Sequence, residues 1–297
     1  MQPRRNKKPF NILLATDGSD HALAAASLTN DLALPPGSTI TILAVLIPRE
    51  ASRFSFLEGA LEQTRAVLKK QDIEIFTQLQ TGYPAEVIHE YSQNQNIDLV
   101  ILGAKGLRHT LGILLGGVAQ QVVEYTQAPV LVVRSPYKGL KRVMAAVDES
   151  GCSQNILEFL SGSGFHLPLP LPKDVEISLV HVLPPPFVYS RYIPSVHAGQ
   201  IFIPPDEEDN IMREEEKSRA KELLKRAVEA LGEAGILASS DLLTGDAASE
   251  IIDYARDNKI DLILAGSRGL SAARAWLLGS VSRKLVHYAG CSVLVVK

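Results

Sequence analysis

Residues 260–282 read IDLILAGSRGLSAARAWLLGSVS, and this stretch sets the organisation of the whole chain. Its apolar run, 262–265, shows no alternation of polar and apolar residues, which is typical of a parallel strand covered on both faces. Gly266 and Gly269 follow the run, and Gly279 and Ser280 stand just before VSRKLVHYAG, which predicts a helix. A loop of this kind presents free backbone N–H groups at a helix N-terminus, so the stretch predicts an anion-binding site.

Two serines extend this prediction. The hydroxyls of Ser280 and Ser282 could donate further hydrogen bonds to a phosphate at the start of the helix. In the alternative interpretation, the glycines are ordinary turn residues and Ser280 only caps the helix. The rest of the chain has to distinguish the two interpretations.

A second copy of the stretch occurs 163 residues earlier, where residues 97–107 read IDLVILGAKGL. The same offset relates the VLVV at 130–133 to the VLVV at 293–296. Self-similarity over this length indicates two tandem copies of one domain. We place the copies at residues 9–136 and 140–297.

The second copy is the longer one. Asp17 and Asp148 are equivalent but only 131 residues apart, so the second copy carries 32 additional residues. Most of them follow Val182, in a Pro-rich segment and a charged run that predicts a long amphipathic helix. We interpret the helix as a crossover with a solvated face, and the insertion around residues 183–210 as a lid or an interface loop.

Each copy alternates strands with helices, which requires right-handed crossovers and a parallel sheet. In the first copy the predicted strands are Asn11–Ala15, Thr39–Ile47, Ile73–Leu79, Leu99–Leu102 and Val130–Val133. The predicted helices are Ser19–Leu34, Leu57–Lys70, Ala85–Asn94 and Gly117–Thr126. The fold class is therefore α/β, with a five-stranded sheet of order 3-2-1-4-5 in each copy and helices on both faces.

Ligands of such open sheets bind at the carboxyl ends of the strands, where the strand order reverses. Here that crevice lies between the first and fourth strands. Asp17 and Asp148 end the first strands, while Gly103 and Gly266 end the fourth strands. Topology alone therefore predicts that these distant motifs come together.

Composition excludes several classes of protein. The 297 residues are 46% hydrophobic and 21% charged, with a net charge of -3, so we expect neither nucleic acid nor an acidic membrane as a partner. The sequence has two cysteines, Cys152 and Cys291, which suits a reducing cytoplasm. Neither a run of about 18 apolar residues nor a signal peptide is recognisable, so we expect no membrane-spanning helix.

Four motifs follow one another in the second copy or in both: VDES at 147–150, TGDAASEI at 244–251, the spacing G-x2-G-x9-G-S from Gly266, and a final VLVV. Together they resemble the universal stress protein family in a tandem form, over nearly all of residues 9–297. The resemblance implies a nucleotide-binding α/β domain that is usually dimeric, with ATP laid across the crevice. It also implies that the last strands pair in a pseudo-two-fold arrangement, either within the chain or with a second chain in a homodimer.

The resemblance assigns site residues by position. In the second copy it implies Asp148 near the ribose and phosphates and Val182 against the adenine. It places the phosphates among Gly266, Gly269, Gly279, Ser280, Val281 and Ser282. Arg268 either neutralises a phosphate or is a solvated loop charge, and Asp148 could hold Mg²⁺ through water.

The first copy has equivalent residues but lacks both hydroxyls. Its equivalent residues are Asp17, Val45, Gly103, Gly106, Gly116 and Gly117. Gly117 replaces Ser280, and Ala119 replaces Ser282. A hydrogen bond to a charged group contributes about 1.5–3 kcal/mol, so the loss of one weakens binding about tenfold to a hundredfold. We therefore expect the nucleotide to be held mainly in the second copy.

The expected function is a cytoplasmic, ATP-binding stress-response or signalling module, with ADP or AMP as alternative ligands. Neither a G-x-x-x-x-G-K-[ST] loop nor a kinase-type lysine and catalytic loop is recognisable, so we assign no catalytic residue. One alternative is a slow ATPase or autophosphorylating enzyme that uses Asp148. Another is an interaction module that binds no nucleotide.

Overall fold

The structure is a computed structural model that describes residues 8–70, 72–107, 114–163, 167–185, 207–267 and 278–297. Ten strands occur in this part of the chain: β1 (Asn11–Ala15), β2 (Thr39–Leu46), β3 (Glu74–Thr81), β4 (Leu99–Gly103), β5 (Val130–Val133), β6 (Arg142–Ala146), β7 (Glu176–Leu183), β8 (Ala238–Thr244), β9 (Leu262–Gly266) and β10 (Ser292–Val296). The helices of the first half are α1 (Asp20–Asp31), the 3-10 helix η1 (Pro48–Arg53), α2 (Phe54–Val67), α3 (Pro84–Asn94) and α4 (Gly117–Tyr125). Those of the second half are α5 (Gly151–Ser161), α6 (Glu207–Glu233), α7 (Ala247–Asp257) and α8 (Ser280–Tyr288).

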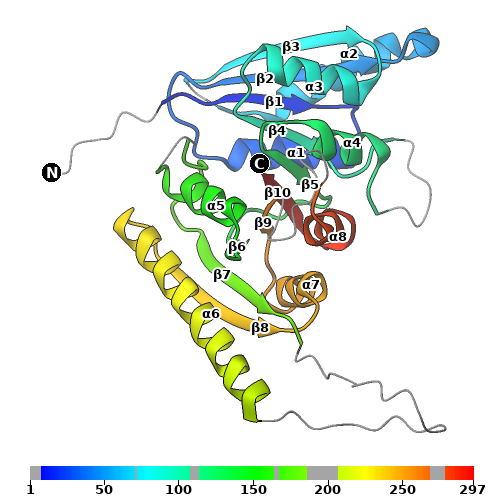
Figure 1. Ribbon diagram of the computed structural model, residues 1–297. Helices are drawn as coiled ribbons and strands as arrows, with labels where there is room; N and C mark the ends of the chain where they lie inside the picture. Colours follow the sequence, from blue (N-terminus) through cyan, green and yellow to red (C-terminus); the bar gives the residue numbers. More distant parts are fainter. Residues whose placement is uncertain (1–7, 71, 108–113, 164–166, 186–206, 268–277) are drawn as a thin grey trace, which may run out of the picture.

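All ten described strands form one sheet, in the order β3-β2-β1-β4-β5-β10-β9-β6-β7-β8. Each half therefore has the order 3-2-1-4-5, which confirms the predicted fold class. Neighbouring strands within each half are parallel, whereas β5 and β10 are antiparallel. The intramolecular pairing of the two halves is thus present, as Figure 1 shows at the centre of the molecule.

The pairing of β5 with β10 defines a pseudo-two-fold axis. Leu131 lies directly opposite Leu294, and these residues are equivalent because they are 163 positions apart. On either side Val132 pairs with Val293 and Val130 with Val295, so each half presents the same residues to the other. The axis therefore passes through the Leu131–Leu294 pair.

The apolar runs of the central strands are buried on both faces, as their lack of alternation predicts. One layer of the core packs β-strand residues against α1, α2, α5 and α6. The other layer packs them against α3, α4, α7 and α8. Figure 1 shows α5 and α6 on one side of the second half and α7 and α8 on the other.

The predicted element boundaries are correct for β1 and β5 and differ by one to three residues elsewhere. For example, α2 begins at Phe54, three residues before the predicted start. Ser19 is not the first helical residue but the N-cap of α1, because its hydroxyl accepts a hydrogen bond from the N–H of Ala22. The limits proposed for the two domains, 9–136 and 140–297, stay a prediction.

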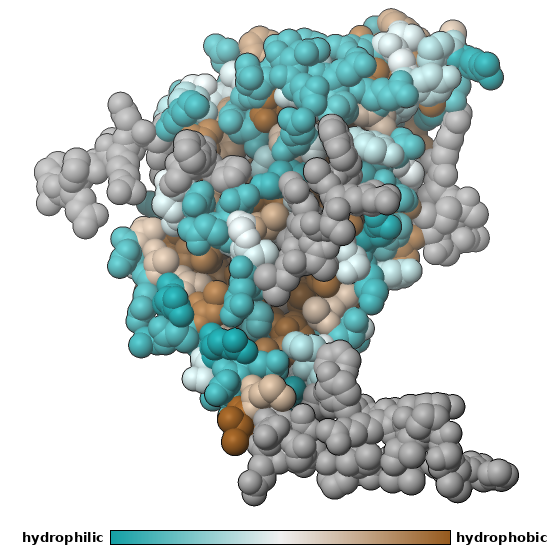
Figure 2. Space-filling view, viewed as in Figure 1, coloured by the Kyte–Doolittle hydropathy of each residue, from teal (hydrophilic) through white to brown (hydrophobic). Residues whose placement is uncertain are grey.

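The long inserted helix is present as α6, which has 27 residues. Its buried residues Ala220, Leu224, Ala227 and Leu231 recur at helical spacing and form one stripe against the core. Two apolar side chains near its otherwise charged N-terminal end, Ile211 and Met212, are 60% and 55% accessible, and Figure 2 shows a small hydrophobic patch at the lower end of the helix. The predicted lid or interface loop falls, from residue 186 to 206, outside the described residues. None of the described helices has the length and apolar character of a membrane span.

Candidate functional site

Two cavities open at the carboxyl ends of the strands, one in each half. The first cavity, in the first half, has a volume of about 710 Å³, and the second cavity, in the second half, about 470 Å³. The first lies beside the junction of β1 with β4 and the second beside the junction of β6 with β9, where the strand order reverses. An open parallel sheet binds ligands at this position.

The structure brings the predicted site residues together in these cavities. The first cavity is lined by all six predicted residues of its half: Asp17, Val45, Gly103, Gly106, Gly116 and Gly117. The second cavity is lined by seven predicted residues: Asp148, Val182, Gly266, Gly279, Ser280, Val281 and Ser282. The other two, Arg268 and Gly269, fall outside the described residues.

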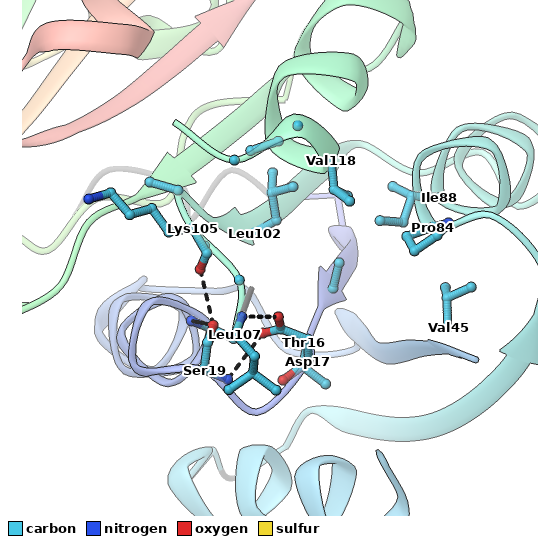
Figure 3. A pocket seen from close by; sticks show the side chains of 18 of the residues that line it. Thr16, Asp17, Ser19, Val45, Pro84, Ile88, Leu102, Lys105, Leu107 and Val118 are labelled. Atoms are coloured by element: carbon cyan, nitrogen blue, oxygen red, sulfur yellow. Dashed lines mark hydrogen bonds between the residues drawn. The ribbon is translucent and has the colours of Figure 1, made fainter. Parts of the chain in front are cut away.

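Asp17 joins the end of β1 to the loop that follows β4. Its Oδ1 accepts a hydrogen bond from the N–H of Ser19, and its Oδ2 accepts one from the N–H of Leu107, both at 3.0 Å. A Cβ on Gly106 would overlap Oδ2, so this close approach requires glycine. The Ser19 hydroxyl adds a bond of 3.1 Å to the carbonyl of Lys105 (Figure 3).

Asp148 occupies the equivalent position, keeps the equivalent N–H donor and has two hydroxyl donors in addition. Its Oδ1 accepts hydrogen bonds from the N–H of Ser150 at 3.0 Å and from the hydroxyl of Ser153 at 2.6 Å. The hydroxyl of Ser150 donates to the same oxygen. Its described hydrogen bonds therefore come from the N-cap and the first turn of α5, whereas the residue equivalent to Leu107 lies outside the described residues.

Each glycine loop leads into a helix whose first turn lacks a side-chain cap. The N–H of Gly116 donates to the carbonyl of Ala104, and that of Gly279 donates to the carbonyl of Ser267, both at 2.8 Å. These two bonds are equivalent in the repeat and hold the residue before each helix close to the end of the preceding strand. No side chain caps α4 or α8 in the described structure, so their first N–H groups are left for another acceptor.

The two serines of α8 have different environments. Ser280 is exposed at the start of the helix and lines the second cavity. Ser282 is 5% accessible, and its hydroxyl donates to the carbonyl of Gly266 at the end of β9. A hydroxyl has one hydrogen, so Ser282 has none left for a phosphate in this arrangement. The hydroxyl that distinguishes the two cavities is therefore that of Ser280.

An apolar wall faces the polar residues in each cavity. In the first cavity Val45 on β2 lies with Pro84 and Ile88, away from Asp17 and Lys105 (Figure 3). In the second cavity the wall contains Val182 on β7 with Ala247 and Ile251, the equivalents of Pro84 and Ile88. Such walls suit a flat apolar group, which orients the opposite end of a ligand towards the helix N-terminus.

His181 precedes Val182 on β7. Its Nδ1 lies 2.7 Å from the carbonyl oxygen of Val147, so Nδ1–H donates to that carbonyl. The side chain lines the second cavity and ties β7 to the end of β6. Ala44 occupies the equivalent position in the first half.

Sequence reasoning missed the charged residues that line each cavity from neighbouring elements. The first cavity receives Glu50 and Arg53 from η1, which form an ion pair of 3.3 Å. The second cavity receives Glu216 and Arg219 from α6. Their spacing of three residues on a helix was the signal that could have indicated a shared face.

Comparisons with known proteins identify the family and agree with the fold. Residues 10–134 and 139–297 both match the family model described as the universal stress protein family. Over 97% of its length the chain is 26% identical to universal stress protein Slr1230 of Synechocystis sp., of which it covers 99%. Over 52% of its length it is 30% identical to universal stress protein YxiE of Bacillus subtilis, of which it covers 98%. A solved universal stress protein from Archaeoglobus fulgidus has the same fold, with a TM-score of 0.63 and 20% identity over 97% of this chain and 98% of that one.

Proposed function

The chain belongs to the universal stress protein family, and from that premise we propose that it binds an adenine nucleotide as a regulatory ligand. One observation carries the proposal: an apolar wall, a carboxylate and a helix start without a side-chain cap converge in each cavity. The wall suits a purine and the helix N-terminus suits a phosphate. We further propose that the protein acts as a cytoplasmic stress-response module.

The arrangement of the nucleotide follows from these groups. In the second cavity we propose the adenine against Val182, the ribose near Asp148, and the phosphates at the start of α8 from Gly279 to Ser282. In the first cavity Val45, Asp17 and the Gly116–Gly117 pair take these roles. We propose ATP as the ligand, with ADP and AMP as alternatives.

A magnesium ion fits beside the phosphates. Mg²⁺ is usually bound by one or two carboxylates together with phosphate oxygens and water. Asp148 is a carboxylate that lines the second cavity, and three donors already approach its Oδ1. We propose that it holds the ion through water and does not coordinate it directly.

The distribution of nucleotide between the cavities depends on opposing features. Ser280 favours the second cavity, because it supplies a hydroxyl where the first half has Gly117. The described charges oppose this preference. The first cavity has two cations, Arg53 and Lys105, whereas Arg219 is the single described cation that lines the second. We therefore propose that both cavities bind, with the hydroxyl of Ser280 as the main advantage of the second.

A calorimetric titration with ATP tests the proposal. Two glycine variants separate the cavities: Gly106→Ala forces Asp17 away from the loop of the first, and Gly279→Val obstructs the N–H groups of the second. Gly59→Ala is the matched control, because a Cβ on Gly59 meets no atom within 4 Å. We expect each site variant to remove one binding event and the control to remove none. The absence of any nucleotide affinity in the unmodified protein would refute the proposal.

A further inference from the structure

One short helix contacts both cavities. The N-terminus of α8, at Gly279 and Ser280, lines the second cavity, whereas its C-terminal residues His287 and Tyr288 line the first. The helix has nine residues and is therefore about 13 Å long. The first cavity is thus built mainly from the first half but has part of its wall from the second. Figure 1 shows α8 next to β5, where the halves meet.

Arg134 fixes the end of α8 against the glycine loop of the first half. This residue follows β5, and its guanidinium donates to the carbonyl of Leu114 at 2.8 Å. It also donates to the carbonyls of Val286 and His287, at 2.8 and 2.9 Å. One side chain therefore holds the end of α8 beside the residues that lead into Gly116, where we place the phosphates.

The same contact offsets the partial negative charge at the C-terminus of α8. The carbonyl groups at a helix C-terminus carry partial negative charge and disfavour an anion nearby. Arg134 satisfies two of these carbonyls with a cation. The end of α8 can therefore face a phosphate site without repelling the ligand.

From these contacts we propose that the first cavity is a composite site, in which His287 and Tyr288 of the second half contact the terminal phosphates of a bound nucleotide. The inference rests on the proposed function. An imidazole and a phenol both supply hydrogen-bond donors. Tyr288 is 61% accessible, as expected of a side chain at the rim of a cavity.

The second cavity lacks this contribution among the residues that the structure describes. The residues equivalent to His287 and Tyr288 are Glu124 and Tyr125, and neither lines the second cavity. Glu124 is acidic, so a phosphate contact at this position would be unfavourable. Among the described residues, the composite wall is therefore found at the first cavity alone.

Binding of a phosphate beside His287 should raise the fraction of His287 that is protonated. Burial lowers the pKa of His287, as do Arg134 and Arg283, while Glu124 on α4 raises it; the Tyr288 ring lies 5.9 Å away. A phosphate placed beside the imidazole raises its pKa again, so binding takes up a proton. Affinity for a phosphorylated ligand should therefore increase as the pH falls from 8 to 6.

The test measures binding of ATP, AMP and adenosine to the full chain by calorimetry. The relevant binding event is the one that Gly106→Ala removes. We expect His287→Ala to lower the affinity of this cavity for ATP about tenfold, which is the effect of one hydrogen bond to a charged group. The affinity for adenosine, which has no phosphate, should fall less than about twofold. Tyr288→Ala should act in the same direction, and Tyr288→Phe should separate the hydroxyl from the ring. The matched control is Tyr125→Ala, which removes a tyrosine that is 60% accessible at the equivalent position.

Two further readouts exclude trivial explanations. Melting without nucleotide shows whether each variant folds, and His287→Gln supplies a smaller change if the alanine variant does not. The pH dependence of ATP affinity should be flatter in His287→Ala than in the unmodified protein, since titration of the ligand itself is common to both. Unchanged ATP affinity in the folded His287 and Tyr288 variants would overturn the composite site but leave nucleotide binding intact. Loss of all nucleotide binding in the unmodified protein would overturn both.

Discussion

Replacement of Arg134 by methionine tests how the two halves are held together. Arg134 donates three hydrogen bonds to backbone carbonyls, and two of them, to Val286 and His287, are partly buried at the end of α8. A hydrogen bond from a charged donor contributes about 1.5–3 kcal/mol when it is well shielded. The bond to Leu114 is exposed and should contribute little. Because the two shielded bonds share one guanidinium, we expect Arg134→Met to lower the free energy of unfolding by about 2–4 kcal/mol.

The repeat supplies the control for this experiment. Lys297 is equivalent to Arg134, and its Nζ donates to the carbonyl of Val123, the equivalent of Val286. Each half therefore places a basic side chain on the last helix of the other half. The described bonds to the other half's helix number one for the lysine and two for the arginine, so we expect Lys297→Met to lower the free energy of unfolding by about 1–2 kcal/mol, half of the value for Arg134→Met. Urea unfolding of the nucleotide-free protein measures both values. A larger loss in Lys297→Met than in Arg134→Met would refute the assignment of Arg134 as the stronger link.

Two other predictions concern single side chains. Ser280→Ala should weaken ATP binding in the second cavity about tenfold with little change in melting temperature, because Ser280 is exposed and faces the cavity. Ser282→Ala should leave ATP binding nearly unchanged but lower the free energy of unfolding by about 1 kcal/mol, because the Ser282 hydroxyl donates to the carbonyl of Gly266. Calorimetry measures the ATP affinity of both variants and thermal melting their stability. Equal effects of the two substitutions on ATP binding would contradict the structure. Burial raises the pKa of the Cys291 thiol to about 12, so at pH 8 about one molecule in 10⁴ carries the reactive thiolate. Mass spectrometry after iodoacetamide treatment of the native protein should find Cys291 unmodified and, after unfolding, modified.

Much of the fold was predictable because the chain repeats itself. The 163-residue offset identified equivalent residues, and uninterrupted apolar runs located β5 and β10. The pairing partner of these strands was not predictable, because a second chain would satisfy the same exposed edges. The offset also relates Arg134 to Lys297, so a basic residue after each VLVV was a visible signal of the interface. The carbonyl partners of these two basic residues depend on how α4 and α8 lie relative to the pseudo-two-fold axis. The spacing of residues in the sequence does not specify that arrangement.

The sequence predicts which residues of the candidate site lie together, but it does not predict the hydrogen-bond partners of their side chains. The role of Ser282 illustrates the limit. Sequence places its hydroxyl two residues after Ser280 on the same helix turn, yet the structure directs it to the carbonyl of Gly266. Similarly, Arg219 reaches the second cavity because α6 packs across β7 and β8, a long-range arrangement that no local pattern contains.

A tandem chain permits differences between its halves that a symmetric dimer forbids. In a homodimer, a substitution at the interface appears twice, so a histidine added beside one site is added beside the other. Here position 287 is histidine where its equivalent, 124, is glutamate, and position 280 is serine where its equivalent, 117, is glycine. Under the proposed assignment, each cavity has one phosphate contact that the other lacks: the first lacks the hydroxyl but borders His287, and the second has the hydroxyl but no described contact with Glu124. The same helix, α8, carries both Ser280 and His287. A shift of α8 on binding in one cavity would therefore move a lining residue of the other cavity. The two cavities are thus suited to bind the same nucleotide with different affinities.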